Sequence, residues 1–497
     1  MIAYKQLEQH FEKILHIDNS INILYWDLVN TTPVGSRSYR QKEISSLVAL
    51  SSELLTSDFT LQLIKDSDQI LSQLDLWQVA NLNQIKKKYY NSVCVSKDLQ
   101  KQYFVACSES EFIWTKAKRE GSYDEFKPYL NRVFTILKEI AELKKEHLQK
   151  SSAYEVEIDQ YDPDRSLSEV RSIFSTIKSE LPGLVSNIIK RQQAEQINNI
   201  SLSISIDQQK KLVTKMLKDF GFNLDQGRVD KGIHPCCIGA PGDIRILTQF
   251  DQNNFLNTIL ALVHEVGHAL YEQSLPTKYQ NQPVGRAQGM AVHESQSLIM
   301  ENHVLKSREF MAYLARLLRD ELGITEKGYD AENLFKIITR VKRSNIRIEA
   351  DEVTYFLHQL IRFEIEEDIF NGHINVDMLP ECWNSKMKEY LAIVPSDVRE
   401  GCIQDIHWSK GKLGYFPAYV TGAIMAAMMM NQIKVTNPDI MNEIAKGKFD
   451  NMNNFLDNKV RKYGSLKSSE EILVMATGKS KVQPIDLIQY LKDKYLS

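Results

Sequence analysis

Apolar residues recur at helical spacing over long stretches of this sequence. In one example they run from Phe126 through Val133 and Leu137 to Ile140, with Lys and Glu on the opposite face. Similar patterns, separated by short segments with Gly, Pro or Asn, predict helices over most of 1–150, 165–195, 207–220, 253–274, 287–322, 331–370 and 438–460. The best strand candidate is the β-branched and aromatic stretch 244–250. The pattern therefore predicts a mainly helical protein with a small β-sheet.

The composition narrows the class of protein further. Gly (21) and Pro (13) are scarce among the 497 residues, which disfavours β-sandwiches and propellers because those folds need many tight turns. The net charge of −3 gives no electrostatic reason to expect a nucleic-acid or anionic-membrane partner. Since no change in composition marks a boundary, we expect one domain over 1–497.

The N-terminal sequence, the apolar stretches and the cysteines indicate the cellular compartment of the protein. The first ten residues lack the basic and apolar regions of a secretory signal, so we expect the mature chain to begin at Met1. The longest strongly apolar stretch, 422–430, is far shorter than the ~20 residues that span a bilayer. Six cysteines form no C-x-x-C pair and are too sparse for a disulfide scaffold. These features predict a cytoplasmic protein.

The segment His264-Glu-Val-Gly-His268 points to metal chemistry. On a helix, residues i and i+4 lie on one face, so both imidazoles can bind one cation, with Glu265 beside the water that the metal activates. This is the H-E-x-x-H pattern, in which the histidines bind Zn²⁺ and the glutamate is the general base. Two surface histidines on an ordinary helix are the alternative. It fits poorly, because the preceding segment 255–263 is apolar enough to be buried, where unpaired polar side chains are costly.

A catalytic zinc needs a third protein ligand and an open fourth position. The helix of the motif should end near Gln273, because Ser, Pro, Asn and Gly interrupt the pattern beyond it. A second helix then carries Glu294, which we predict to be the third ligand of a His₂Glu site. The adjacent His293 is the second candidate, and Glu301 is a weaker one.

Further sequence blocks accompany the metal motif. They are Tyr25-Trp-Asp27 with Thr32-Pro-Val-Gly35, Gly227-Arg-Val-Asp230 leading to His234-Pro235, Asp243-Ile-Arg245, His293-Glu-Ser-Gln296, Ile346-Arg-Ile-Glu-Ala-Asp351, Gly401-Cys-Ile-Gln-Asp-Ile-His-Trp408 and Gly414-Tyr-Phe-Pro417. Together and in this order, over nearly the whole chain, they resemble the carboxypeptidase Taq family of zinc metallocarboxypeptidases. H-E-x-x-H alone marks a superfamily, whereas this series of blocks is specific.

The resemblance implies a fold, an activity and a site. It implies that His264, His268 and Glu294 bind one Zn²⁺ per chain and that Glu265 is the general base. It implies a large single-core helical zincin in which a small β-sheet lies next to the H-E-x-x-H helix. About 1–200 would form one wall of a long groove, and about 201–497 would carry the zinc site. Substrates would be peptides with a free C-terminus and varied side chains, and the protein would be a homodimer. Co²⁺ and Mn²⁺ remain alternatives to Zn²⁺.

Other residues of these blocks are candidates for binding substrate. The blocks around His234, Asp243 and Arg245 line the groove in members of the family. Two positions depart from those blocks, because Cys236 stands in place of Phe and Leu247 in place of Thr. We expect the departures to affect substrate preference more than catalysis.

A carboxypeptidase must bind the terminal carboxylate of its substrate. A guanidinium does so with two parallel hydrogen bonds, and Arg347, inside an otherwise helical pattern, is the candidate. The alternative is a structural ion pair with Asp351 or Glu352. If Arg347 has that structural role, Arg245 is the next candidate.

Two hydrogen-bond donors, His407 and Tyr415, are candidates for stabilising the oxyanion of the tetrahedral intermediate. The alternative for Tyr415 is aromatic packing with Phe416 and Tyr419. We further expect the peptide to align along the edge of the strand at 244–250 by β-augmentation.

Two other functions remain open from the sequence. A zinc oligopeptidase or aminopeptidase would use the same His₂Glu site, and the spacing does not distinguish it. A non-catalytic helical binding protein would have lost Glu265 or a ligand, whereas this sequence keeps them all.

Overall fold

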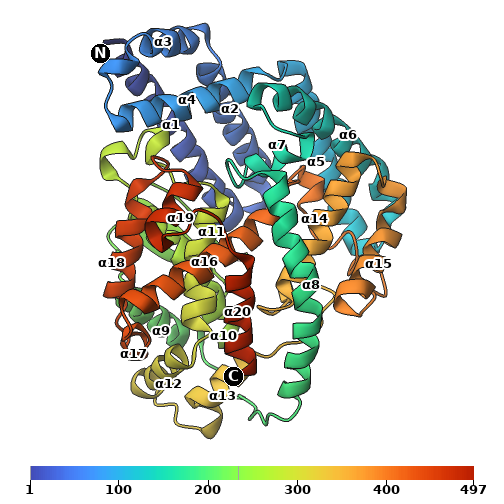
Figure 1. Cartoon of the computed structure of the whole chain (residues 1–497), viewed down its shortest axis with the longest axis vertical. Coiled ribbons are helices and arrows are strands. Elements are labelled where there is room, and N and C mark those ends of the chain that lie inside the picture. The colour runs from blue at the N-terminus through green and yellow to red at the C-terminus, as the bar shows by residue number, and fades with distance from the viewer. Residues whose placement is uncertain (1, 233) are drawn as a thin grey trace.

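The computed structural model describes residues 2–232 and 234–497. It confirms the mainly helical prediction, since helices fill most of the volume in Figure 1. The helices that precede the sheet are α1 (Ile2–Asn30), α2 (Arg37–Leu55), α3 (Asp58–Asp68), α4 (Leu76–Val93), α5 (Lys97–Glu120), α6 (Tyr123–Leu148), α7 (Ala153–Asp159), α8 (Leu167–Gln192) and α9 (Ile206–Asp219).

The helices that follow the sheet build the rest of the molecule. They are α10 (Phe255–Gln273), α11 (Met290–Leu298), α12 (Arg308–Leu322), α13 (Ala331–Ile338), α14 (Tyr355–Asn371), α15 (Leu379–Leu391), α16 (Phe416–Thr436), α17 (Ile440–Ala445), α18 (Asp450–Lys459), α19 (Ser469–Thr477) and α20 (Pro484–Leu496). The H-E-x-x-H helix, α10, ends at Gln273 as predicted, and α11 carries Glu294. A π-helical segment, η5 (Ile299–Leu305), joins α11 to α12.

The prediction of a continuous helix over 331–370 is wrong between α13 and α14. Arg347 begins a short 3₁₀ turn, Arg347–Glu349, within an irregular segment. The side chain of Gln404 replaces helical bonding there, because its Oε1 accepts from the amide of Arg347 at 2.8 Å and its Nε2 donates to the carbonyl of Asn345 at 2.9 Å. The carboxylate of Asp351 then accepts from the amide of Thr354, just before α14 begins.

The small sheet has three strands in the order β1-β3-β2, with β1 at Gly227–Lys231, β2 at Cys236–Ala240 and β3 at Asp243–Thr248. β3 matches the predicted strand and packs against α10. It is the central strand, parallel to β1 and antiparallel to β2, so both of its edges are already paired. The predicted alignment of a peptide along the edge of β3 is therefore wrong. β2 is an edge strand, and Asn22 on α1 donates to the carbonyl of Gly239 on it at 3.3 Å.

Buried side chains form a main core, a smaller one and a minor cluster of Ala141, Ala153 and Val156. The main core runs from α5 to α20 and includes the buried methionines of α16, as predicted for the 425–430 run. The smaller core lies among α1, α3 and α4 at the N-terminal end of the molecule (Figure 1). The division of the domain into about 1–200 and 201–497 stays a prediction. By length and apolar composition, no single described helix qualifies as a membrane span, although the bent pair Val34–Leu55 and Asp58–Asp68 qualifies when taken together.

Candidate metal centre

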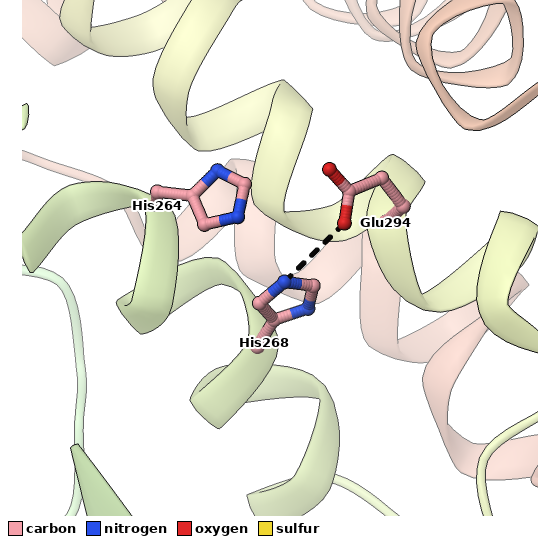
Figure 2. Close-up of side chains that lie close together, drawn as sticks. All are labelled: His264, His268 and Glu294. Atoms are coloured by element: carbon pink, nitrogen blue, oxygen red, sulfur yellow. Dashed lines mark ion pairs between the residues drawn. The ribbon is translucent and has the colours of Figure 1, made fainter. Parts of the chain in front are cut away.

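Three side chains from two neighbouring helices converge at one point. The ligand atoms of His264 and His268 on α10 and of Glu294 on α11 all lie within 4.8 Å of one another. Figure 2 shows the two rings and the carboxylate turned toward a common space, and Nε2 of His268 lies 3.5 Å from Oε2 of Glu294. A tetrahedral ion with bonds of about 2.0 Å separates its ligand atoms by roughly 3.3 Å. The three predicted ligands are therefore close enough to hold a single metal ion.

Two glycines allow the helices to approach closely enough for this geometry. A Cβ on Gly267, inside the H-E-x-x-H motif, would lie 2.5 Å from the backbone oxygen of Gln296 on α11. On the other side of α11, a Cβ on Gly422 of α16 would lie 2.9 Å from the backbone oxygen of Ala291. Because both positions lack a Cβ, α11 packs tightly between α10 and α16, and Glu294 reaches the histidines.

Glu301 contacts one of the two histidines of the candidate site. Its Oε2 lies 2.7 Å from Nδ1 of His264, and Nζ of the buried Lys306 donates to its Oε1 at 2.7 Å. A carboxylate on Nδ1 fixes the tautomer of the ring and leaves Nε2 for the metal. Glu301, weighed above as a third ligand, is thus placed to orient His264.

His293, the other alternative ligand, lies behind His268. The two Nδ1 atoms are 2.6 Å apart, and Nε2 of His293 lies 2.8 Å from Oε1 of Glu272. With Nε2 of His268 directed to the cation, Nδ1 of His268 donates to His293, which donates in turn to Glu272. The sequence interpretation missed Glu272. Its position four residues after His268 on the same helix was the available signal.

Glu265 is placed to act as the base. It is 7% exposed and lines the same cleft as His264 and Glu294. Burial raises the pKa of Glu265 to about 7; the carboxylate of Glu294 adds to this rise and His264 opposes it. A carboxyl group with such a pKa can exchange a proton near neutral pH.

His264 and Glu294, two of the three candidate ligands, line a cleft of about 990 Å³. Its wall includes His264, Glu265, Glu294, Arg347, Tyr355 and Tyr419. From the first 200 residues, Ile200 contributes to this wall. Because the metal site and Arg347 share one cavity, a peptide can contact both at once.

Arg347 is held in an ion pair at the cleft wall. Its Nε donates to Oδ1 of Asp405 at 2.9 Å, and its Nη1 donates to the hydroxyl oxygen of Tyr355 at 3.1 Å. Arg362 donates to the other oxygen of the same carboxylate at 2.7 Å. The ion-pair partner of Arg347 is therefore Asp405. The alternative role considered from the sequence, an ion pair with Asp351 or Glu352, is wrong about the partner. Two guanidiniums share one carboxylate, which leaves a net positive charge beside the cleft. The sequence interpretation missed the roles of Asp405 and Arg362.

His407 and Tyr415 lie side by side, with ring centroids 5.2 Å apart. Burial lowers the pKa of His407 to about 3, so the ring is neutral near pH 7 and keeps one N–H to donate. Burial raises the pKa of Tyr415, so its hydroxyl stays protonated. Tyr419, on the cleft wall, donates to the hydroxyl oxygen of Tyr415 at 3.3 Å. Tyr415 also packs edge-on against Phe416 and Tyr419. The oxyanion role of His407 and Tyr415 stays a prediction.

Glu366 on α14 holds the segment between these two residues. Its buried carboxylate accepts from Nε1 of Trp408 at 2.7 Å and from the amide of Gly414 at 2.8 Å. Trp408 directly follows His407, and Gly414 directly precedes Tyr415. One carboxylate thus holds the neighbours of both candidates.

The remaining predicted substrate contacts lie near the sheet. His234 is exposed, and its neighbour Pro235 belongs to the described cleft wall. Asp243 binds Arg245 through two hydrogen bonds of 2.9 and 2.6 Å, and the guanidinium of Arg245 stacks over Trp26 at 4.5 Å. The proposed substrate roles of His234, Asp243 and Arg245 stay predictions.

The two departures from the family blocks are neighbours in the sheet. Cys236 on β2 is the cross-strand partner of Leu247 on β3. The position with Cys in place of Phe therefore faces the position with Leu in place of Thr on the neighbouring strand.

Known proteins resemble this chain in both sequence and fold. Residues 6–495 match the family described as "Carboxypeptidase Taq (M32) metallopeptidase". Carboxypeptidase 1 of Bacillus subtilis (strain 168) is 28% identical, covering 99% of this chain and 97% of that protein. Thermostable carboxypeptidase 1 of Thermus thermophilus is also 28% identical, covering 99% and 98%. The structure of Trypanosoma cruzi metallocarboxypeptidase 1 superposes with a TM-score of 0.97 at 29% identity, covering all of both chains. A Pyrococcus furiosus carboxypeptidase gives a TM-score of 0.94 at 27% identity, covering 99% of each chain.

Proposed function

Because this chain belongs to the carboxypeptidase Taq (M32) family and is a metallocarboxypeptidase, we propose that it uses one Zn²⁺ to release C-terminal residues of varied kinds from peptides. The observation that carries the proposal is the shared cleft, where Arg347 lines one cavity with His264 and Glu294 of the ligand group. The family assignment favours carboxypeptidase activity over the aminopeptidase and binding-protein alternatives.

The choice of Zn²⁺ rests on the donor set. Two imidazoles and one carboxylate from His264, His268 and Glu294 are a common ligand set of catalytic zinc, and they leave a fourth position open. Imidazole and carboxylate also suit Co²⁺ and Mn²⁺, which stay alternatives. When bound, the cation supplies a Lewis acid that acidifies water and polarises a carbonyl group.

The residues of the chain supply the remaining steps. Arg347 binds the terminal carboxylate of the peptide with its charged guanidinium. Glu265 takes a proton from the water that attacks the scissile carbonyl carbon, and the C–N bond breaks as Glu265 returns that proton to the leaving amine. His407 and Tyr415 donate hydrogen bonds to the oxygen that becomes negative during the attack.

Assembly and location complete the proposal. We propose that the protein forms a homodimer, as the resemblance implies, and that it acts in the cytoplasm. Analytical ultracentrifugation of the purified chain tests the dimer, and a sedimentation coefficient of a monomer across micromolar concentrations would contradict it.

The proposal is tested by digesting a peptide library with mass-spectrometric readout. We expect successive loss of C-terminal residues, no comparable loss from C-terminally amidated copies, and no activity after chelation until Zn²⁺ is restored. Glu265→Gln serves as the inactive control. Cleavage from the N-terminus, or equal cleavage of acids and amides, would refute the carboxypeptidase assignment.

A further inference from the structure

The π-helical segment η5, Ile299–Leu305, directly follows the helix that carries Glu294. Its wide turn shows in the bond from the amide of Lys306 to the carbonyl of Glu301, five residues back, at 3.1 Å. Single π turns are rare and are often found at functional sites. Here the wide turn carries Glu301, whose carboxylate contacts the metal ligand His264.

The C-terminal helix α20 bonds to this segment. The carbonyl of Asn302 accepts from the hydroxyl of Tyr490 at 2.7 Å and from Nζ of Lys494 at 2.9 Å. The ring of Tyr490 also packs against the ring of His303, with centroids 4.1 Å apart. Tyr490 and Lys494 lie one turn apart on α20, which packs beside α16 (Figure 1). Two side chains from the end of the sequence thus meet one carbonyl of the π turn.

The same two side chains reach the other wall of the cleft. Nζ of Lys494 pairs with Glu352 at 2.6 Å, and the side chains are 9% and 1% exposed. Glu352 accepts from the hydroxyl of Tyr495 at 2.8 Å. The hydroxyl of Tyr490 also lies 2.6 Å from this carboxylate, so its one proton is shared between Glu352 and the carbonyl of Asn302. Glu352 comes five residues after Arg347 and lines the same cleft as Asn302. α20 therefore holds the metal-side wall and the Arg347-side wall in one relative position.

We propose that α20 is a positioning element of the metal centre, in which Tyr490 and Lys494 hold the π turn so that Glu301 orients His264. The inference rests on the metal site proposed above and not on any peptide substrate. A buried ion pair alone would not support it, since such pairs are often replaced by apolar residues without loss of stability. The support comes from what the two side chains bind. Both contact the carbonyl of Asn302, which directly follows Glu301, the residue that contacts His264.

The test uses full-length variants of α20. Tyr490→Phe removes the hydroxyl and keeps the ring on His303. The double variant Lys494→Met with Glu352→Gln removes both charges, so that neither is left buried without its partner. Lys492→Met is the matched control, since this lysine of the same helix pairs with Glu180 at 3.0 Å on the surface, with side chains 40% and 39% exposed.

The measured quantity is the Zn²⁺ dissociation constant of the metal-free protein, obtained by competition with a chromophoric chelator. Loss of a partner outside the ligand shell typically weakens metal binding 10–100-fold. We expect a loss of about 10-fold in Tyr490→Phe, more in the double variant, and none in Lys492→Met. Thermal unfolding of the metal-free proteins serves as the check on folding.

A folded Tyr490→Phe protein with wild-type Zn²⁺ affinity would overturn the inference, and so would an equal loss in Lys492→Met. The readout involves no peptide. If the wild-type protein bound Zn²⁺ but failed to cleave peptides, the proposed function would be refuted. The comparison of Zn²⁺ affinities among the variants would still decide this inference.

Discussion

Removal of the Arg347 guanidinium is the most direct test of how the cleft recognises a peptide end. In Arg347→Ala, hydrolysis of free-acid peptides should fall sharply, while the poor hydrolysis of their amides should barely change. Only the acid offers the second oxygen and the charge that a guanidinium binds in pairs.

The size of the effect follows from the surroundings of Arg347. Arg362 keeps its bond of 2.7 Å to Asp405, so the substitution does not leave that carboxylate unpaired and the fold should survive. The loss should therefore be that of one charge-assisted contact, about 2–3 kcal/mol. This corresponds to roughly a 30- to 150-fold decrease in kcat/KM for acids. Arg347→Lys should recover part of the loss, since it restores the charge without the planar fork.

The assay compares kcat/KM for matched acid and amide peptides in wild type, Arg347→Ala and a control. Arg343→Ala is a suitable control, because this arginine lies in the same segment and donates to Ser186 at 3.0 Å, away from the described cleft wall. Equal losses on acid and amide would show that Arg347 supports the fold or the oxyanion. Another residue would then have to bind the terminal carboxylate of the substrate, and Arg245 is the next candidate.

Three further experiments test other parts of the site and the fold. Glu265→Gln should keep the Zn²⁺ content near wild type and lower kcat by about 10²–10⁴-fold, because the amide keeps the shape of the side chain without its basic oxygen; an unchanged kcat would remove its role as base. Glu294→Ala should weaken Zn²⁺ binding more than His293→Ala, because Glu294 supplies a ligand atom while His293 acts on His268; the opposite order in chelator competition would reassign the third ligand. Burial raises the pKa of Glu157 from 4.5 to about 8, so the folded protein holds a proton that the unfolded chain releases. Wild-type stability should therefore fall, by an amount on the order of a few kcal/mol, as the pH rises between these values, and the fall should be smaller in Glu157→Gln. Identical pH profiles of Tm for the two proteins would contradict this.

Local sequence patterns were sufficient to predict several helices and the candidate metal ligands of this protein. Helical periodicity gave α6, α8 and α10 because each face of a helix is set by residues three and four apart. The same rule paired His264 with His268, and the interruption after Gln273 placed Glu294 on the next helix. These features depend on neighbours in the chain, so the sequence alone was sufficient for them.

Tertiary structure decided the features that depend on distant partners. The pattern around Arg347 was taken as helical, but the side chain of Gln404, 57 residues away, takes up its backbone amide. Its ion-pair partner is Asp405 and not the nearby Asp351, because a buried guanidinium pairs with whichever carboxylate the fold brings within reach. The central place of β3 and the bonds from Lys494 to the π turn have the same origin. Periodicity records which side of an element is buried, whereas the partner of a buried polar group is fixed only when separate elements pack together.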